Sequence, residues 1–146
     1  MVYFYHMHVE FGKYQFKLKR EGQQDLIWDI VRQKWIMLYP EEKVRQMWLH
    51  YLIYDKKFSP SLIQVEKKLV INGLTKRIDI AIYNQEMHPV IIIECKAPNI
   101  PIDESVMEQL IRYNQHYRCE RLIVSNGNTH LGFEVKGSNI VQISEL

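Results

Sequence analysis

Apolar residues recur at helical spacing after Pro40. They form one stripe made of Val44, Met47, Trp48, Tyr51 and Leu52. Pro40 suits the first turn of a helix, where its missing N–H would have no partner, and Glu41 and Glu42 suit the positive end of the helix dipole. The pattern therefore predicts a helix from Pro40 to about Tyr54.

Strand-like segments follow this helix. Residues 62–69, 76–83 and 90–96 are rich in β-branched and apolar types. Asn72-Gly73 is a strong hairpin turn, and the polar loop 84–89 separates the second segment from the third. We therefore expect three strands joined by hairpins, which makes neighbouring strands antiparallel.

A second helix is predicted from about Asp103 to Tyr117, after two prolines break the chain. Its expected inward residues are Val106, Leu110, Tyr113 and Tyr117. A short apolar strand at 121–125 can return parallel to the sheet by a crossover, and the last strands are expected at 132–135 and 140–143. The order helix, three strands, helix, strand predicts an α/β protein with a mixed α+β sheet.

Before the first helix, residues 14–20 and 26–38 favour a small β-meander of structural function. The chain has 146 residues, of which 47% are hydrophobic, so one compact domain is expected over 1–146. Within it, 1–39 form a β-rich extension and 40–146 the core. Aromatic residues near the N-terminus, Tyr3, Phe4, Tyr5 and Phe11, would cover either a core edge or a homodimer face.

The net charge and the cysteine content limit the possible partners, metal sites and cellular location of the protein. A net charge of +2 neither demands nor excludes nucleic acid, so a basic face must be local. Its candidate members are Lys56, Lys57, Lys67, Lys68, Lys76 and Arg77. Two cysteines without a Cys-x-x-Cys pair suggest neither a disulfide framework nor a zinc ribbon. With no stretch long enough to span a membrane, the expected location is the cytoplasm.

The candidate chemistry lies at the end of the segment 90–96. Alternation places Glu94 and Lys96 on one face of this strand, and Ile91, Ile93 and Cys95 on the other. The preceding hairpin brings Asp79 toward Glu94. Two carboxylates beside a lysine form a site for Mg²⁺ or Mn²⁺, where the lysine can steady a water that attacks a phosphodiester. The alternative is an ion-paired patch at a strand end.

Residues 77–80, 93–98, 109–114 and 124–127 occur in an order that resembles a known family. Asp79 followed by Glu94-Cys95-Lys96 resembles the PD-(D/E)XK nuclease signature, with Ile78 where that family often has proline. More narrowly, these segments and 40–46 resemble the N-terminal nuclease domain of type I restriction endonuclease R subunits. The resemblance implies a restriction-endonuclease-like core.

The resemblance also implies roles for individual residues. Asp79 and Glu94 would hold the metal, with the backbone carbonyl of Cys95 as a further ligand, and Lys96 would be catalytic. Glu42 would approach the metal from the first helix, with Glu41 as second choice; the alternative is a helix-terminal acid. Gln109 and Tyr113, four apart on the second helix, would border the site; the alternative for Tyr113 is a core aromatic. From the residues alone, Arg112 would either meet a phosphate or be solvated. For Glu66 we expect a solvent-facing pair with Lys68, and the alternative is that it faces the site.

The resulting hypothesis is a Mg²⁺- or Mn²⁺-dependent nuclease acting on DNA. The alternative is a non-cleaving nucleic-acid-binding or assembly module that keeps the fold; a ribonuclease or repair nuclease would differ only in substrate. The chain contains no Gly-x-x-x-x-Gly-Lys-Ser/Thr loop. Either a separate restriction-modification subunit supplies an ATP-dependent motor, or the domain works alone, or the chain is a fragment or a relic.

Overall fold

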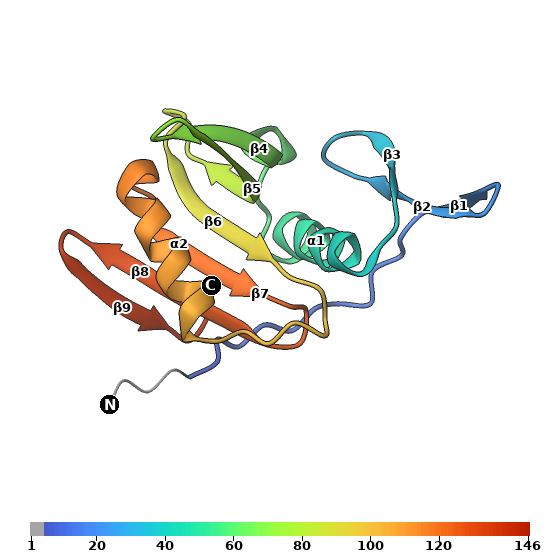
Figure 1. The fold of residues 1–146 in the computed structure, drawn as a ribbon. Helices are drawn as coiled ribbons and strands as arrows, with labels where there is room; N and C mark the ends of the chain where they lie inside the picture. The colour runs from blue at the N-terminus through green and yellow to red at the C-terminus, as the bar shows by residue number, and fades with distance from the viewer. Residues whose placement is uncertain (1–4) are drawn as a thin grey trace.

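The computed structural model describes residues 5–146, which contain two β-sheets (Figure 1). The smaller sheet is antiparallel with the strand order β1-β2-β3. Its strands are β1 (Leu18–Glu21), β2 (Gln24–Asp29) and β3 (Lys34–Met37). This sheet confirms the predicted N-terminal β-meander.

The larger sheet has six strands in sequence order, β4 to β9. They are β4 (Ile63–Ile71), β5 (Leu74–Tyr83), β6 (Pro89–Cys95), β7 (Arg121–Ser125), β8 (His130–Lys136) and β9 (Asn139–Ile143). β6 and β7 pair in parallel, whereas the other neighbours are antiparallel. The predicted mixed sheet and its crossover are confirmed.

Two helices flank this sheet. α1 (Pro40–His50) continues into a π-helical turn, η1 (Tyr51–Asp55), which extends the helical segment to about its predicted end. A short 3₁₀ turn, η2 (Pro60–Leu62), leads into β4. α2 (Glu104–Tyr117) forms the crossover between β6 and β7. Asp103 caps α2 by accepting a hydrogen bond from the Val106 N–H at 3.2 Å, which satisfies one of the unpaired amides of its first turn.

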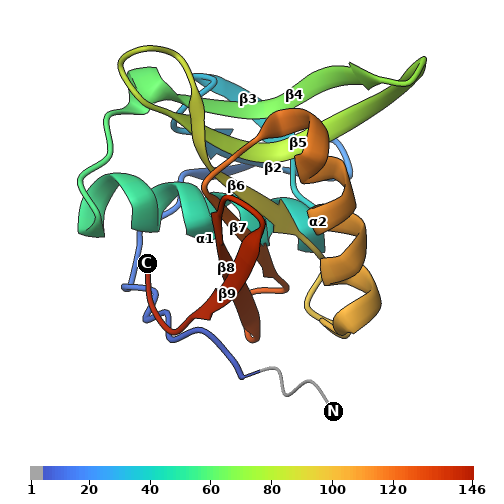
Figure 2. The ribbon, with the colours of Figure 1, turned by 90° about the vertical axis from the view of Figure 1, so that its left-hand side faces the viewer.

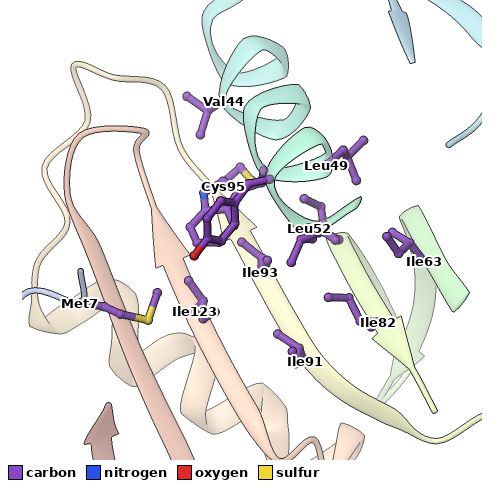
Figure 3. Close-up of a cluster of buried hydrophobic side chains, with 13 residues drawn as sticks. Met7, Val44, Leu49, Leu52, Ile63, Ile82, Ile91, Ile93, Cys95 and Ile123 are labelled. Carbon is purple, nitrogen blue, oxygen red and sulfur yellow. The ribbon is translucent and has the colours of Figure 1, made fainter. Parts of the chain in front are cut away.

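The helices cover opposite faces of the six-stranded sheet (Figures 1 and 2). Under α1, Val44, Trp48 and Leu52 pack on one core cluster (Figure 3), which also contains Met7, Leu49, Tyr51, Ile63, Ile80, Ile82, Ile91, Ile93, Cys95 and Ile123. Under α2, the second cluster is built from Ile78, Ala81, Tyr83, Ile92, Met107, Leu110, Cys119, Leu122, Val124, Leu131 and Phe133. β6 therefore contributes its odd positions to one cluster and Ile92 to the other, as its alternation predicts.

The inward face of α2 differs from the prediction in part. Leu110 is buried as expected, and Val106 and Tyr117 pack against the cluster while partly exposed. The other two buried residues of this helix are Met107 and Asn114. Asn114 is buried because its amide donates to the Cys119 carbonyl and accepts from the Cys119 N–H, which ties the helix end to the next strand. Tyr113 instead faces a cleft described below.

The N-terminal segment joins the larger sheet directly. Met7 N–H donates to the His130 carbonyl at 2.7 Å, and the Met7 side chain is buried against Gly132. Of the aromatics expected to cover a core edge or a dimer face, Phe11 packs on Trp48 with ring centroids 5.3 Å apart, and Tyr5 is exposed. Tyr3 and Phe4 lie outside the described residues. Within the described part of the chain, no helix has the length and apolar character needed to cross a membrane.

Candidate functional site

The carboxyl end of β6 opens onto a cleft of about 170 Å³ between β5, β6 and α2. Glu94 and Lys96 line it from β6, and Gln109 and Tyr113 line it from α2. The Lys96 Nζ lies 3.6 Å from Glu94 Oε1, and both side chains are about 30% exposed, at 32% and 27%. Four residues that the sequence analysis assigned to one site therefore lie together, two at the end of β6 and two on α2.

Asp79 lies beside this cleft, where β5 and β6 stop pairing. The last pair of residues before the site is Ile80 with Ile93. Beyond it, Asp79 Oδ2 accepts a hydrogen bond from the Cys95 N–H at 2.8 Å, so the carboxylate replaces a backbone partner at the end of β6. The side chain is only 8% exposed. The predicted approach of Asp79 to the end of β6 is thus present in the structure.

Glu94 is the most perturbed carboxyl group of the site. The pKa of Glu94 is raised to about 8: burial is the largest cause, the nearby Asp79 carboxylate adds to it, and Lys96 partly offsets both effects. Two carboxylates in contact repel each other unless a proton or a cation lies near them. The pair is therefore suited to a divalent cation.

The donor set fits a hard cation such as Mg²⁺ or Mn²⁺, which prefers oxygen ligands. Mg²⁺ binds through one or two carboxylates and keeps several waters. Among the described residues, no cluster of three or more His, Cys, Asp or Glu side chains is arranged to hold a metal ion. Asp79, Glu94 and a backbone carbonyl are consistent with a cation that takes much of its coordination from water. The role of the Cys95 carbonyl stays a prediction.

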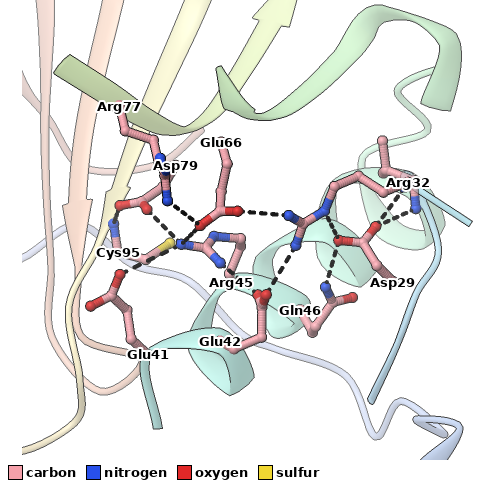
Figure 4. A network of polar contacts seen from close by, with 11 residues as sticks. Asp29, Arg32, Glu41, Glu42, Arg45, Gln46, Glu66, Arg77, Asp79 and Cys95 are labelled. Carbon is pink, nitrogen blue, oxygen red and sulfur yellow. Dashed lines mark hydrogen bonds and ion pairs between the residues drawn. The ribbon is translucent and has the colours of Figure 1, made fainter. Parts of the chain in front are cut away.

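The two acids of the first turn of α1 have different surroundings. Glu42 is fully buried, and its oxygens accept from Arg45 Nη1 at 2.8 Å and from Arg32 Nη2 at 2.9 Å. Burial and then repulsion from Asp79 raise the pKa of Glu41, whereas Arg45 and Lys96 lower it. The charges of Asp79 and Lys96 thus act on Glu41, whereas Glu42 is paired with the guanidinium groups of Arg32 and Arg45 (Figure 4). The metal-site role predicted for Glu42 stays untested.

A buried ion network surrounds Asp79, and sequence reasoning did not find its cations. Arg45, 1% exposed, donates from Nη2 to Asp79 Oδ1 at 2.7 Å. Arg32 donates from Nη1 to Glu66 at 2.8 Å. The expected pair of Glu66 with Lys68 is wrong, because Glu66 turns toward the guanidinium groups of Arg32, Arg45 and Arg77. The spacing of Arg45 from Glu41 and Glu42, four and three residues along one helix, was the available signal.

On the α2 side, Gln109 Nε2 lies 3.1 Å from the Tyr113 hydroxyl, and Lys76 Nζ lies 4.8 Å from the centre of the Tyr113 ring. Hydrogen bonds from Lys76 and Gln109 lower the pKa of Tyr113. Lys76 and Arg77 also line the cleft, whereas Lys56 contacts the Leu146 carbonyl elsewhere.

Some predicted cations lie apart from this cleft. Arg112 is exposed on α2 and is not one of the lining residues. Lys67 lies 4.9 Å from the centre of the Tyr83 ring. The basic surface at the cleft therefore contains fewer residues than the sequence led us to expect. Of the six expected residues, Lys76 and Arg77 of β5 line the cleft.

The order of elements defines a restriction-endonuclease-like core: a helix, three antiparallel strands, a crossover helix and a parallel strand. In this core Asp79 of β5 lies beside Glu94 and Lys96 at the end of β6. Residues 40–146 match the family of the type I restriction enzyme R protein N terminus (HSDR_N), and the chain belongs to this family. The match begins at the first residue of α1.

One solved structure is similar in part: the fragment structure of a putative HsdR subunit of a type I restriction enzyme from Vibrio vulnificus YJ016. The identity is 22% and the TM-score 0.41, over 57% of this chain and 16% of that chain. The chain therefore spans a small part of the protein it resembles. The comparison with curated proteins finds no match.

Proposed function

We propose that this chain is a metal-dependent nuclease that hydrolyses DNA phosphodiester bonds. The observation that carries the proposal is the convergence of three residues: Glu94 and Lys96 line the cleft, and the Asp79 carboxylate lies close enough to raise the pKa of Glu94. A pure binding surface gains nothing from two carboxylates that repel phosphate, whereas a metal site needs them. Membership of the R-subunit family supports the same reaction class.

Asp79, Glu94 and the Cys95 carbonyl would hold Mg²⁺ or Mn²⁺. The bound cation would polarise a phosphoryl oxygen and offset the charge that develops on it. Lys96 lies at the cleft beside Glu94, where its ammonium group can steady the attacking water. Gln109 and Tyr113 would place the nucleic-acid backbone against this group, since their polar atoms face the same cleft.

The biological setting is part of the proposal. Membership of the R-protein family supports a partnership of this domain with restriction-modification subunits and an ATP-dependent motor. Both cysteines are buried and free, which suits the cytoplasm. We propose DNA as substrate on the strength of the family.

The test is cleavage of supercoiled plasmid and of single-stranded DNA in Mg²⁺, Mn²⁺ and EDTA. We expect cutting that requires metal, and we expect Glu94→Ala and Lys96→Ala to lower its rate by at least about 10²-fold, because each removes a group that acts on the developing charge. Glu134 and Lys136 of β8 form a matched control, since they repeat the Glu-x-Lys spacing with Nζ and Oε1 4.0 Å apart.

Glu134→Ala and Lys136→Ala should cut at the parent rate. Cutting by Lys96→Ala at the parent rate would refute the site. If no variant and no condition cuts, binding to the same DNA in EDTA decides for the non-cleaving module: salt-sensitive binding without metal would support it.

A further inference from the structure

Arg45 holds the Asp79 carboxylate in one place. Its guanidinium donates from Nη1 to Glu42 Oε2 at 2.8 Å and from Nη2 to Asp79 Oδ1 at 2.7 Å (Figure 4). A guanidinium is planar, so these two contacts fix its orientation as well as its charge. The contact therefore sets the position of Asp79 relative to α1.

Asp79 is held from both sides. The Cys95 N–H donates to Oδ2, and Arg45 donates to Oδ1. A carboxylate offers about four lone-pair positions, so two contacts leave it able to bind a cation while its rotamer is fixed. This is the usual arrangement around a metal ligand, in which a neighbour orients the ligand without occupying it fully.

The same network reaches into the three-stranded sheet, which lies outside the family match. Asp29, the last residue of β2, is fully buried. It accepts from the backbone amides of Val31 and Arg32 and from Arg32 Nε at 2.7 Å, so it fixes the Arg32 side chain. Gln46 of α1 donates to the same carboxylate at 3.0 Å.

Arg32 connects Asp29 to two acidic residues of the core. Its Nη2 donates to Glu42 and its Nη1 to Glu66, and both acids also lie beside Arg45. The contacts form a continuous chain of ions, Asp29, Arg32, Glu42, Arg45 and Asp79, which runs from β2 through α1 to β5. The extension is thus attached to the proposed metal ligand by charged hydrogen bonds.

We propose that Arg45 is a positioning residue for Asp79, and that Arg32 of the N-terminal extension keeps Arg45 in its productive orientation. The inference rests on the proposed function, since it assigns Asp79 to the metal. It extends that function to the N-terminal extension, in which Asp29 and Arg32 help to position the residues of the site. A merely structural ion network would stabilise the fold without setting the position of Asp79.

The chain offers a direct probe of Asp79. It has two cysteines, so ¹⁵N-cysteine labelling gives two backbone amide signals. The Cys95 amide donates to Asp79, and the Cys119 amide donates to Asn114 Oδ1 at 2.8 Å, away from this network. Cys119 is therefore an internal control of the same bond type.

The variant Arg45→Lys keeps the charge and removes the planar fork. In the metal-free protein we expect the Cys95 amide proton to shift upfield and to exchange faster, because Asp79 no longer holds one position, while Cys119 stays unchanged. Arg32→Lys should shift the Cys95 signal in the same direction by less. Arg20→Lys changes an exposed pair with Asp25 in the same sheet and should shift neither signal.

Binding of Mn²⁺ alone, followed by calorimetry, is the second readout. We expect Arg45→Lys to weaken the affinity by about 10–100-fold, the usual effect of losing a group that orients a metal ligand. Leu131→Ala, a truncation in the α2 cluster, serves as the control for lost stability. Measured below the melting temperature of every variant, it should bind Mn²⁺ as the parent does.

Two results would overturn the inference: an unchanged Cys95 amide in both Arg45→Lys and Arg32→Lys, or equal Mn²⁺ losses in Arg45→Lys and Leu131→Ala. If Arg45→Lys does not fold, Arg32→Lys decides by the same signals. The amide readout needs neither metal nor DNA. Failure of the parent protein to cut DNA would therefore count against the nuclease proposal. A Cys95 amide signal that does not shift in the variants would count against the role of Arg45.

Discussion

At the residue scale, Glu94 makes a distinct contribution to the pH dependence of stability. Its pKa is raised to about 8, chiefly by burial and next by Asp79, from the ordinary value of 4.5. Between these two values the folded protein binds more protons at Glu94 than the unfolded chain does. The contribution of Glu94 to the free energy of unfolding therefore falls as pH rises from about 4.5 to about 8.

Burial lowers the pKa of His130 to about 4 from its ordinary value of 6.5, so His130 adds stability as pH rises to about 6.5 and offsets Glu94 there. We therefore expect the melting temperature in EDTA to fall mainly between about pH 6.5 and pH 8. Glu94→Gln removes the titrating proton and should flatten the curve in this range, with the largest stabilisation relative to the parent at the alkaline end. Thermal melts by circular dichroism at several pH values measure this. Glu134→Gln, which changes a partly exposed acid on β8, should retain the parental slope, and an equal slope in Glu94→Gln would contradict the assignment.

Much of the site was predictable at this scale, and the missing part has a physical cause. Asp79 lies within β5, Glu94 and Lys96 lie at the end of β6, and a hairpin fixes the register of these two strands, so alternation and one turn suffice to bring them together. Arg32 and Glu66 meet across a sequence separation of 34 residues, between two different sheets. No local pattern encodes such a pair, and a charged residue is ordinarily read as solvated.

At the element scale, β5 and α2 form the two walls of the cleft. Lys76 projects from β5 over the Tyr113 ring of α2, 4.8 Å from its centre, which leaves the ammonium at the cleft. A cation in this place can neutralise one phosphate of a bound strand. Lys56 follows the π-helical turn after α1 and contacts the Leu146 carbonyl instead.

Lys76→Gln should lower the slope of log affinity against log salt concentration by about one, with a uniform loss across DNA sequences, as expected for one phosphate contact. Lys56→Gln, a neutralisation of equal charge, should leave the slope unchanged. Fluorescence anisotropy with labelled DNA, in EDTA to prevent cutting, gives both slopes. Equal slopes for the two variants would place the DNA elsewhere on the surface.

Another element-scale feature is the close approach of the N-terminal segment to β8. A Cβ at Gly132 would lie 2.6 Å from Met7 Sδ and 2.9 Å from Ile143 Cγ1, which is too close for both neighbours. Gly132→Ala should therefore cost about 1–3 kcal/mol of stability, as overpacked sites do. Urea unfolding measures it, with Gly12→Ala as a control whose nearest neighbour is the Tyr14 ring at 3.0 Å.

At the scale of the whole molecule, the helix and strand order was predictable because each element has a clean period and each turn a clear signal. The association of the two sheets was not. It depends on Asp29 and Arg32 of the extension meeting Glu42 of α1, and the sequence shows these residues as ordinary surface charges in separate segments. The buried ions, together with apolar contacts of Met7, Ile30 and Val31 with the α1 cluster, mark where the extension meets the core.

The whole fold should respond to metal through the two carboxylates. A cation that binds the folded chain alone raises the free energy of unfolding by about 2.7 kcal/mol at a concentration 100 times its Kd. We expect Mn²⁺ to raise the melting temperature of the parent more at pH 8.5 than at pH 6. The reason is that Glu94, with a pKa of about 8, must lose its proton to bind the ion.

Glu94→Gln should abolish most of this shift at both pH values, and Glu134→Gln should retain it in full. A shift of equal size in the parent at pH 6 and pH 8.5 would show that Mn²⁺ binds without displacing a proton, and hence not at Glu94. A shift that rises with pH in the parent and is absent in Glu94→Gln would link the raised pKa of Glu94 to metal binding, because the same carboxyl group would then account for both the alkaline loss of stability and its recovery.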